Sequence, residues 1–431
     1  MASIIDEPLY SIIERVRGFV EYRGGRIVFR AGRAEELLEE FKDRIVSAVI
    51  GEELLGEARA WIETLSRELD RSARSLGAYG WLLTKELRSF MRDPRGHLRK
   101  KLFQYTFDLV RGRIGVQEFS AKAVSALNTS FRTNMRSVYQ SWVFASLLSL
   151  MGERGGRLIY PEHGFILLER TGRQRSGSIP PNAIVRLPRG ELSFFLEAPR
   201  PVGWGDSRDL RDAWRLYVSL RPDIMVYPGR VMDIVSRSRT GPPILRPSVI
   251  IECKELEDWY ERARELRGSF ARPISAEEWM SKWLEGLHKG LADILGVEYG
   301  GGGEERRERG LRLKEYKIVA LYKETFKPDE MILVSRKRVP REVRSYLEER
   351  GLQVLDGVEM GDRGSLESLV DLLESIAKPS ESPDPLREVK EALRAKGVSM
   401  EERLVDDAIK RFLLERIGEL EEYMKKNGFY A

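Results

Sequence analysis

Two short stretches decide the expected fold: RPDIMV at residues 221–226 and VIIECK at residues 249–254. Each is an apolar, β-branched run with charged residues at one end, and such runs predict buried strands. Side chains along a strand alternate between its faces, so Glu252 and Lys254 should point the same way and the residue between them into the opposite layer. The two stretches therefore predict neighbouring strands that bring Asp223 and Glu252 together beside one lysine.

Two carboxylates and a lysine in this arrangement suit one kind of chemistry. Hydrolysis of a phosphodiester uses a hard divalent cation, Mg²⁺ or Mn²⁺, held by carboxylate oxygens with positions left for water and a phosphate oxygen. Asp223 and Glu252 supply such oxygens, and the main-chain carbonyl of Cys253 adds another. Lys254 beside the cation favours ionisation of the attacking water and offsets charge on the transition state. The alternative is a surface ion pair between Lys254 and a carboxylate.

The same pattern resembles the PD-(D/E)xK nuclease superfamily, in which Pro-Asp lies at one strand and Asp or Glu, any residue, and Lys lie on the next. Here Pro222-Asp223 and Glu252-Cys253-Lys254 match. The stretch VYQSWV at residues 138–143, followed by strands, further resembles the nuclease subunit of McrBC-type modification-dependent restriction systems. In that subunit a helix supplies an accessory glutamate, and this chain has Gln140 there. Glutamine brings no negative charge, so we expect Gln140 to orient the water or a metal ligand.

The resemblance implies an α/β (α+β) protein with a restriction-endonuclease-like mixed sheet flanked by helices. We expect a mainly helical N-terminal domain over residues 1–128, a nuclease-like domain over residues 129–375, and a linker with C-terminal helices over residues 376–431. The expected helices are about Thr129–Met151, Ser275–Leu295, Pro340–Arg350 and Leu386–Met424. The expected further strands are Arg157–Tyr160, Phe165–Glu169, Ala183–Leu187, Leu192–Glu197, Lys317–Tyr322, Met331–Val334 and Leu352–Val354, and the Gly24-Gly25 pair predicts a hairpin turn.

Three sets of cationic residues are weaker candidates for contacts with nucleic-acid phosphates. They lie at a junction of expected helices, on the helix expected after the second motif strand, and before a helix N-terminus: Arg99, Lys100 and Lys101; Lys282 and Lys289; Arg336, Lys337 and Arg338. In each case the alternative is a solvated face of a charge-rich protein.

Composition narrows the classes of protein that fit. The 431 residues include 73 Lys and Arg against 68 Asp and Glu, a charge-rich balance that is typical of proteins from hot environments and suggests an archaeon. One cysteine excludes an internal disulfide, and three scattered histidines make no zinc cluster. No apolar run is long enough to span a membrane, so we expect a soluble, cytoplasmic protein.

The sequence therefore predicts a metal-dependent nuclease, an endonuclease acting on DNA in preference to RNA, in restriction or repair. The alternative is a catalytically silent nucleic-acid-binding or scaffolding protein that keeps the fold. The chain has no ATPase motif of its own. The resemblance leaves open a separate ATPase motor subunit and a homodimer.

Overall fold

The computed structural model of this chain describes residues 7–23, 26–29, 33–168, 179–198, 221–234, 245–265, 312–379 and 416. The chain divides into two compact units, Met1–Lys378 and Pro379–Ala431. The helices expected over Ser275–Leu295 and, apart from Arg416, over Leu386–Met424 lie outside the described residues, as do Lys282 and Lys289.

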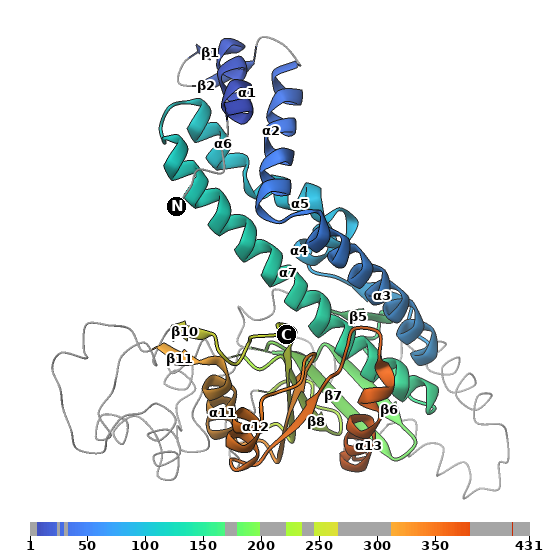
Figure 1. Ribbon diagram of the computed structural model, residues 1–431. Coiled ribbons are helices and arrows are strands. Elements are labelled where there is room, and N and C mark those ends of the chain that lie inside the picture. The colour runs from blue at the N-terminus through green and yellow to red at the C-terminus, as the bar shows by residue number, and fades with distance from the viewer. Residues whose placement is uncertain are drawn as a thin grey trace, which may run out of the picture. The chain divides into compact units, whose positions relative to one another are not determined.

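One long helix, α7 (Val116–Glu153), belongs to both the helical part of the first unit and its sheet. In its first half the buried residues Phe119, Ala123, Leu127 and Phe131 recur every four positions, which marks one face packed on neighbouring helices. From residue 138 to residue 151 every side chain is buried, because this half packs against both α3 and the sheet (Figure 1).

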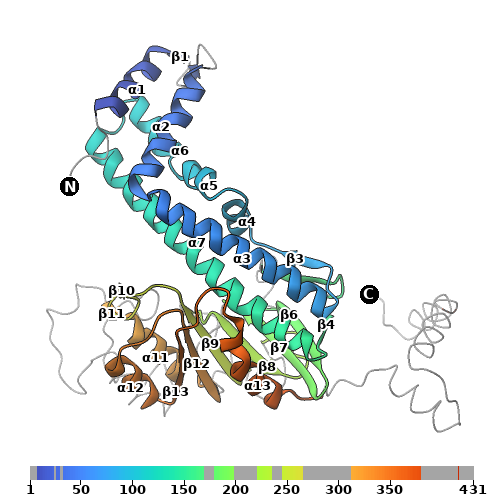
Figure 2. The same ribbon diagram turned by 45° about the vertical axis from the view of Figure 1, so that its right-hand side comes forward.

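The helical part precedes and surrounds the first half of α7. Its elements are α1 (Glu7–Gly18), the hairpin of β1 (Val20–Arg23) and β2 (Arg26–Phe29), α2 (Arg33–Val49), α3 (Glu52–Leu76), α4 (Lys85–Arg92), α5 (Pro94–Lys101) and α6 (Phe103–Val110). Figure 1 and Figure 2 both show α2 and α3 running along α7. The expected hairpin is confirmed, since Arg23 pairs with Arg26 across Gly24-Gly25.

Two capping residues fix the break between α4 and α5. The Thr84 hydroxyl accepts the main-chain N–H of Leu87 at the start of α4, and the Asp93 carboxylate accepts the N–H of Gly96 at the start of α5. Pro94 takes the first helical position of α5, where its missing N–H costs nothing.

The main sheet has seven strands in the order β13-β12-β9-β8-β7-β6-β4. Strands β13, β12 and β9 pair in parallel, and the pairs from β9 to β4 are antiparallel. The bounds are β4 (Arg157–Tyr160), β6 (Ala183–Leu187), β7 (Gly190–Leu196), β8 (Ile224–Pro228), β9 (Val249–Lys254), β12 (Glu330–Ser335) and β13 (Leu352–Asp356). Two small sheets pair β3 (Gly80–Leu82) with β5 (Phe165–Leu167) and β10 (Ala263–Glu265) with β11 (Arg312–Lys314).

Helices cover both faces of the main sheet, which explains why its central strands are apolar on both faces. On one face Val249 and Ile251 of β9 share a core with α7 and with α13 (Glu367–Ile376), which follows the short 3-10 turn Arg363–Leu366. On the other face Ile250 shares a core with α11 (Glu315–Phe326) and α12 (Arg341–Glu348). The expected mixed α/β class is confirmed.

Some of the expected element bounds differ from the structure. The strand expected over Lys317–Tyr322 is wrong, because these residues lie within helix α11. All five residues from 318 to 322 are buried, and a short, wholly apolar run carries no periodicity that separates a strand from a buried helix. The boundary expected after residue 128 falls inside α7, which begins thirteen residues before Thr129. Residues 376–378 lie with the first unit.

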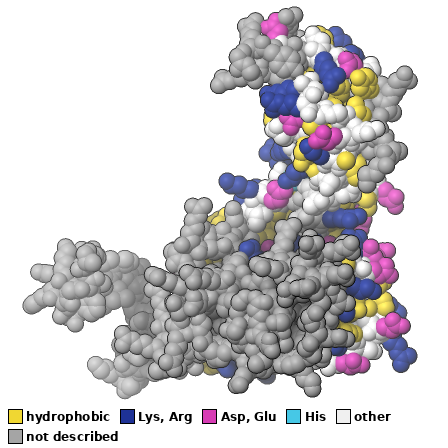
Figure 3. Space-filling view, turned by 90° about the vertical axis from the view of Figure 1, so that its left-hand side faces the viewer, with side chains coloured by type: hydrophobic (Ala, Val, Ile, Leu, Met, Phe, Trp, Pro, Cys, Tyr) yellow, Lys and Arg dark blue, Asp and Glu magenta, His cyan; other side chains and the backbone are white. Residues whose placement is uncertain are grey.

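The described surface is charged in character. Figure 3 shows Lys and Arg side chains interspersed with Asp and Glu side chains over the helical part. Among the helices within the described ranges, none is both long enough and apolar enough to cross a bilayer.

Tyr139 offers a test of how α7 is fixed to the sheet layer. Its fully buried hydroxyl donates to the main-chain carbonyl of Val358, just after β13, at 2.8 Å. Tyr139→Phe leaves that carbonyl unsatisfied, so we expect a loss of about 1–2 kcal/mol, seen as a fall of about 1–3 °C in the thermal unfolding midpoint.

The matched control is Tyr10→Phe, because Tyr10 is 44% exposed on α1. Its midpoint should stay within about 0.5 °C of the parent. Equal midpoints for Tyr139→Phe and the parent would show that the hydroxyl does not hold α7 in place.

Candidate active site

The two motif stretches meet at one edge of the main sheet, where β8 begins and β9 ends. The strands are antiparallel with Ile224 opposite Ile251, and this register brings Asp223 beside Glu252. The main-chain N–H of Asp223 donates to Glu252 Oε2 at 3.3 Å, and Asp223 Oδ2 accepts the N–H of Cys253 at 2.7 Å. The two carboxylates are 5% and 3% exposed, so they form a buried pair and not a surface one.

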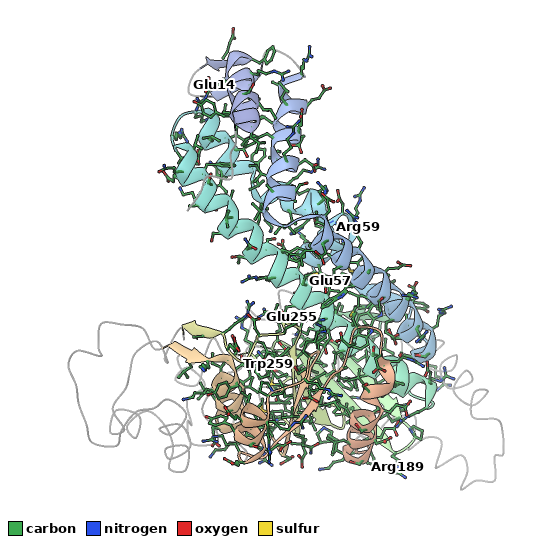
Figure 4. All side chains as sticks on the ribbon, viewed as in Figure 1. Glu14, Glu57, Arg59, Arg189, Glu255 and Trp259 are labelled. Atoms are coloured by element: carbon green, nitrogen blue, oxygen red, sulfur yellow. The ribbon has the colours of Figure 1, made fainter. Side chains whose placement is uncertain are left out.

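Lys254 lies on the same face of β9 as Glu252. Its Nζ donates to Glu252 Oε1 at 2.9 Å and to Glu315 Oε2, on α11, at 3.3 Å. The ammonium also lies 5.9 Å from the centre of the Trp259 ring, which Figure 4 labels near this edge of the sheet. Lys254 is thus held by groups from two layers and projects toward the carboxylate pair.

The charge of Lys254 is fixed by these neighbours. Burial acts to lower the pKa of Lys254, but the carboxylates of Glu315, Glu252 and Asp223 raise it further than burial lowers it. The ammonium therefore stays protonated across the neutral range and acts as a fixed positive charge. It can stabilise an anion or a developing hydroxide, but it cannot serve as a general base.

Cys253 faces the opposite core, together with Val249 and Ile251. Burial, followed by the charge of Asp223, raises the pKa of the Cys253 thiol, so the sulfur stays neutral. This is the alternation expected along β9. The thiol therefore lies on the other face of β9 from the side chains of Glu252 and Lys254.

Gln140 reaches the site from α7. Its Nε2 donates to the main-chain carbonyl of Asp223 at 3.3 Å, and the same carbonyl accepts the N–H of Glu197 at 2.9 Å. A glutamate at position 140 has no proton to donate at neutral pH, so this hydrogen bond belongs to the glutamine. Gln140 therefore positions the backbone that carries the first carboxylate.

Three further charged residues face the site, and the sequence patterns did not single them out: Arg136, Glu197 and Glu255. Arg136 lies one helical turn before Gln140, and its Nε is buried without a hydrogen-bond partner in the described part of the chain. Burial acts to lower the pKa of Arg136, but the carboxylates of Asp223, Glu197 and Glu255 raise it overall. The four-residue spacing from Gln140 was the signal available in the sequence.

Glu197 and Glu255 follow strands β7 and β9 directly. Glu197 has φ of 39°, a left-handed conformation that residues other than glycine rarely adopt. In this conformation its main-chain N–H donates to the main-chain carbonyl of Asp223. Glu255 is buried, which raises the pKa of its carboxyl, and Figure 4 labels it near Trp259. The edge of the sheet where β7 and β9 end and β8 begins is thus rich in carboxylates.

The donor set fits a hard divalent cation. Burial, followed by the charge of Glu252, raises the pKa of Asp223 well above its usual range, so the neighbouring carboxylate opposes the ionisation of Asp223. A cation between them would remove that opposition. Within the described residues, no group of three or more Asp, Glu, His or Cys side chains is arranged to hold a metal ion. The site therefore offers two carboxylates, and a bound cation would take its other ligands from main-chain carbonyl oxygen and water.

Among the remaining predicted cations, Arg336 borders the site, since its main-chain N–H donates to the Lys254 carbonyl at 2.8 Å. Arg336 donates to the main-chain carbonyl of Glu255 at 2.6 Å and lies over the Trp61 ring at 5.1 Å, so its guanidinium is bound within the protein. Lys337 pairs with Glu359 at 2.8 Å, and Arg338 is exposed.

The N-terminal cluster of cations divides between two surfaces. Arg99 and Lys100 line a pocket between helices, whereas Lys101 pairs with Glu86 and lines a different one. These residues are not part of the carboxylate site.

Comparison of the chain with protein-family models, with curated proteins and with solved structures finds no match. The functional argument therefore depends on the residues and geometry described above.

The opposition between the two carboxylates predicts that Asp223→Asn stabilises the metal-free protein. The folded state raises the pKa of Asp223, so ionised Asp223 costs folding free energy above that pKa. In EDTA at pH 7 we expect the variant to unfold about 1–3 °C above the parent. As the pH falls through the raised pKa the parent takes up a proton, and the difference should shrink.

Asp329→Asn is the matched control, because that carboxylate is half exposed in an ion pair with Arg246. Its midpoint should differ little from the parent at either pH. An Asp223→Asn midpoint below the parent at pH 7 would contradict the opposition between the carboxylates.

Proposed function

We propose that this protein is a metal-dependent nuclease of the PD-(D/E)xK type, acting on DNA in preference to RNA. One observation carries the proposal: Asp223 and Glu252 form a buried carboxylate pair at adjacent strand ends, and the Lys254 ammonium forms an ion pair with Glu252, with 2.9 Å between Nζ and Oε1. Burying three charges together is costly unless they serve a function or hold an ion.

The order of elements supports the same proposal. A long helix, α7, carries Gln140 at the position of the accessory glutamate, and the antiparallel strands β6, β7, β8 and β9 follow it. A helix and then a meander of strands is the order in which PD-(D/E)xK cores are usually built. Strand β12 then adds in parallel beside β9. The preference for DNA comes from the resemblance alone.

Each residue has a role in the proposed reaction. Asp223, Glu252 and the main-chain carbonyl of Cys253 hold Mg²⁺ or Mn²⁺, which when bound polarises the phosphate and favours ionisation of water. Lys254, held protonated by its carboxylate neighbours, offsets negative charge on the attacking oxygen and the phosphorane-like transition state. Gln140 holds the main chain of Asp223 in place.

Arg136 completes this charge distribution. Its guanidinium faces the carboxylate edge from α7 and keeps its Nε unbonded within the described residues. The positive charge of this guanidinium would attract a phosphate oxygen of the substrate. A substrate phosphate would then lie between two fixed cations, Arg136 and Lys254.

The second candidate is a silent nucleic-acid-binding protein with the same fold. The hydrogen bond from Gln140 to the Asp223 carbonyl favours it, because the side chain acts there as a structural contact and brings no charge for a second metal. Cleavage assays separate the two candidates.

The test measures cleavage of labelled linear and supercoiled DNA, and of RNA, with Mg²⁺, Mn²⁺ or EDTA. We expect cleavage that EDTA abolishes, and a fall of at least about 100-fold in rate for Asp223→Asn, Glu252→Gln and Lys254→Met, because each removes a ligand or a transition-state charge.

Lys122→Met and Asp329→Asn are matched controls on exposed residues, and both should cleave at the parental rate. Equal cleavage by the three site variants and the parent would place the activity outside this site. Nucleic-acid binding without cleavage by any preparation would favour the silent protein.

A further inference from the structure

A second region of the first unit is also suited to an anionic ligand. A pocket of about 800 Å³ is lined by residues of α2, α4 and α5 and by Phe103 at the start of α6. Six of its lining side chains are cationic and two are acidic: Lys42, Lys85, Arg88, Arg92, Arg99 and Lys100 against Glu39 and Asp93. The excess of four positive charges in one concave surface attracts polyanions.

The two acidic residues are already engaged. Asp93 accepts the N–H of Gly96 as the cap of α5, and Glu39 pairs with Lys42 and, at 3.6 Å, with Arg99. Within the described part of the chain, no carboxylate pairs with the other four cations of the lining: Lys85, Arg88, Arg92 and Lys100. Arg88 donates to the main-chain carbonyl of Leu83 at 3.0 Å and Lys100 to the Ser89 hydroxyl at 3.4 Å, and both partners are neutral. Their charges therefore remain available to a ligand.

Three of these four cations are arranged along one helix. Lys85, Arg88 and Arg92 lie at intervals of three and four residues on α4, while Leu87 and Phe90 of the same helix are buried in the core. Like charges at such spacing repel and destabilise an isolated helix. A row of phosphates along α4 would offset that repulsion.

An aromatic side chain lies beside the cations. Phe103 is 55% exposed at the pocket, with Lys42 Nζ 5.9 Å from its ring centre and the Phe107 ring centre 4.6 Å away. A cationic groove with an exposed aromatic ring is the arrangement that binds single strands, because phosphates track the charges and an unpaired base stacks on the ring. A duplex keeps its base faces inside the stack and cannot use the ring.

We propose that this pocket binds single-stranded nucleic acid, with phosphates along α4 and a base on Phe103. The site is separate from Asp223 and Glu252 and uses no metal. The proposal rests on the proposed function only in taking a nucleic acid as the ligand.

The test is fluorescence anisotropy of a labelled 20-nucleotide single strand and its duplex, in EDTA, from about 50 to 300 mM salt. The full-length Asp223→Asn protein serves as the background, so that no cleavage can occur. We expect Arg88→Gln with Arg92→Gln to weaken single-strand binding at least about 10-fold at low salt and to reduce the salt slope by about 1.4, since each phosphate contact contributes about 0.7.

Phe103→Ala should weaken single-strand binding about 5-fold or more, leave the salt slope unchanged and leave duplex binding unaffected. The matched control is Arg59→Gln with Arg67→Gln on the exposed face of α3, where Figure 4 labels Arg59, and it should bind as the background does. Thermal unfolding within about 1 °C of the background confirms that each variant is folded.

If the α4 double variant bound the single strand as tightly as the background protein, the proposed binding site would be overturned. If the α3 control lost as much affinity as the α4 double variant, the effect would be one of overall charge, and the proposed site would again be overturned. Tight duplex binding with no effect of Phe103→Ala would overturn the single-strand assignment. Failure of the nuclease proposal has a different signature, since the parent would then cleave nothing while these binding differences persisted.

Discussion

The burial of Asp223 and Glu252 side by side is the constraint on which the rest of the candidate site depends. The two carboxylates lie at adjacent strand ends, almost inaccessible to water, and burial together with the charge of Glu252 opposes the ionisation of Asp223. The fold supplies compensation from two layers: Lys254 on the same strand face and Arg136 from α7. Glu197, Glu255 and Glu315 lie near the same cations, so this compensation is shared among several carboxylates, and the metal ion that we propose would add positive charge beside the pair.

Helix α7 is the element that connects this chemistry to the rest of the unit. Its second half is buried on all sides, and three of its side chains have separate tasks on the sheet layer. Tyr139 anchors it to the segment after β13, Gln140 holds the start of β8, and Arg136 faces the carboxylates. Its first half packs on the helices that include α4, so one rigid element belongs to both regions for which we propose ligands.

Local patterns predicted much of the sheet, because β-branched runs bounded by turn residues have few alternatives. The bounds Arg157–Tyr160 and Ala183–Leu187 agree with β4 and β6 residue for residue. The apolar run of α11 predicts a strand but forms a helix, since full burial removes helical periodicity. Asp223 and Glu252 lie together as expected. Arg136 precedes Gln140 by one helical turn on α7, a local spacing that could have pointed to it, whereas Glu197 joins the site through tertiary packing that no local spacing encodes.

The most direct test of the account is the location of Mn²⁺ in crystals of the parent protein, measured by anomalous diffraction. The account predicts one strong peak within about 2.0–2.3 Å of carboxylate oxygens from both Asp223 and Glu252, lost in Asp223→Asn crystals grown alike. The account would be contradicted if crystals at a saturating Mn²⁺ concentration showed no peak between these two side chains and Lys254 remained their ion-pair partner.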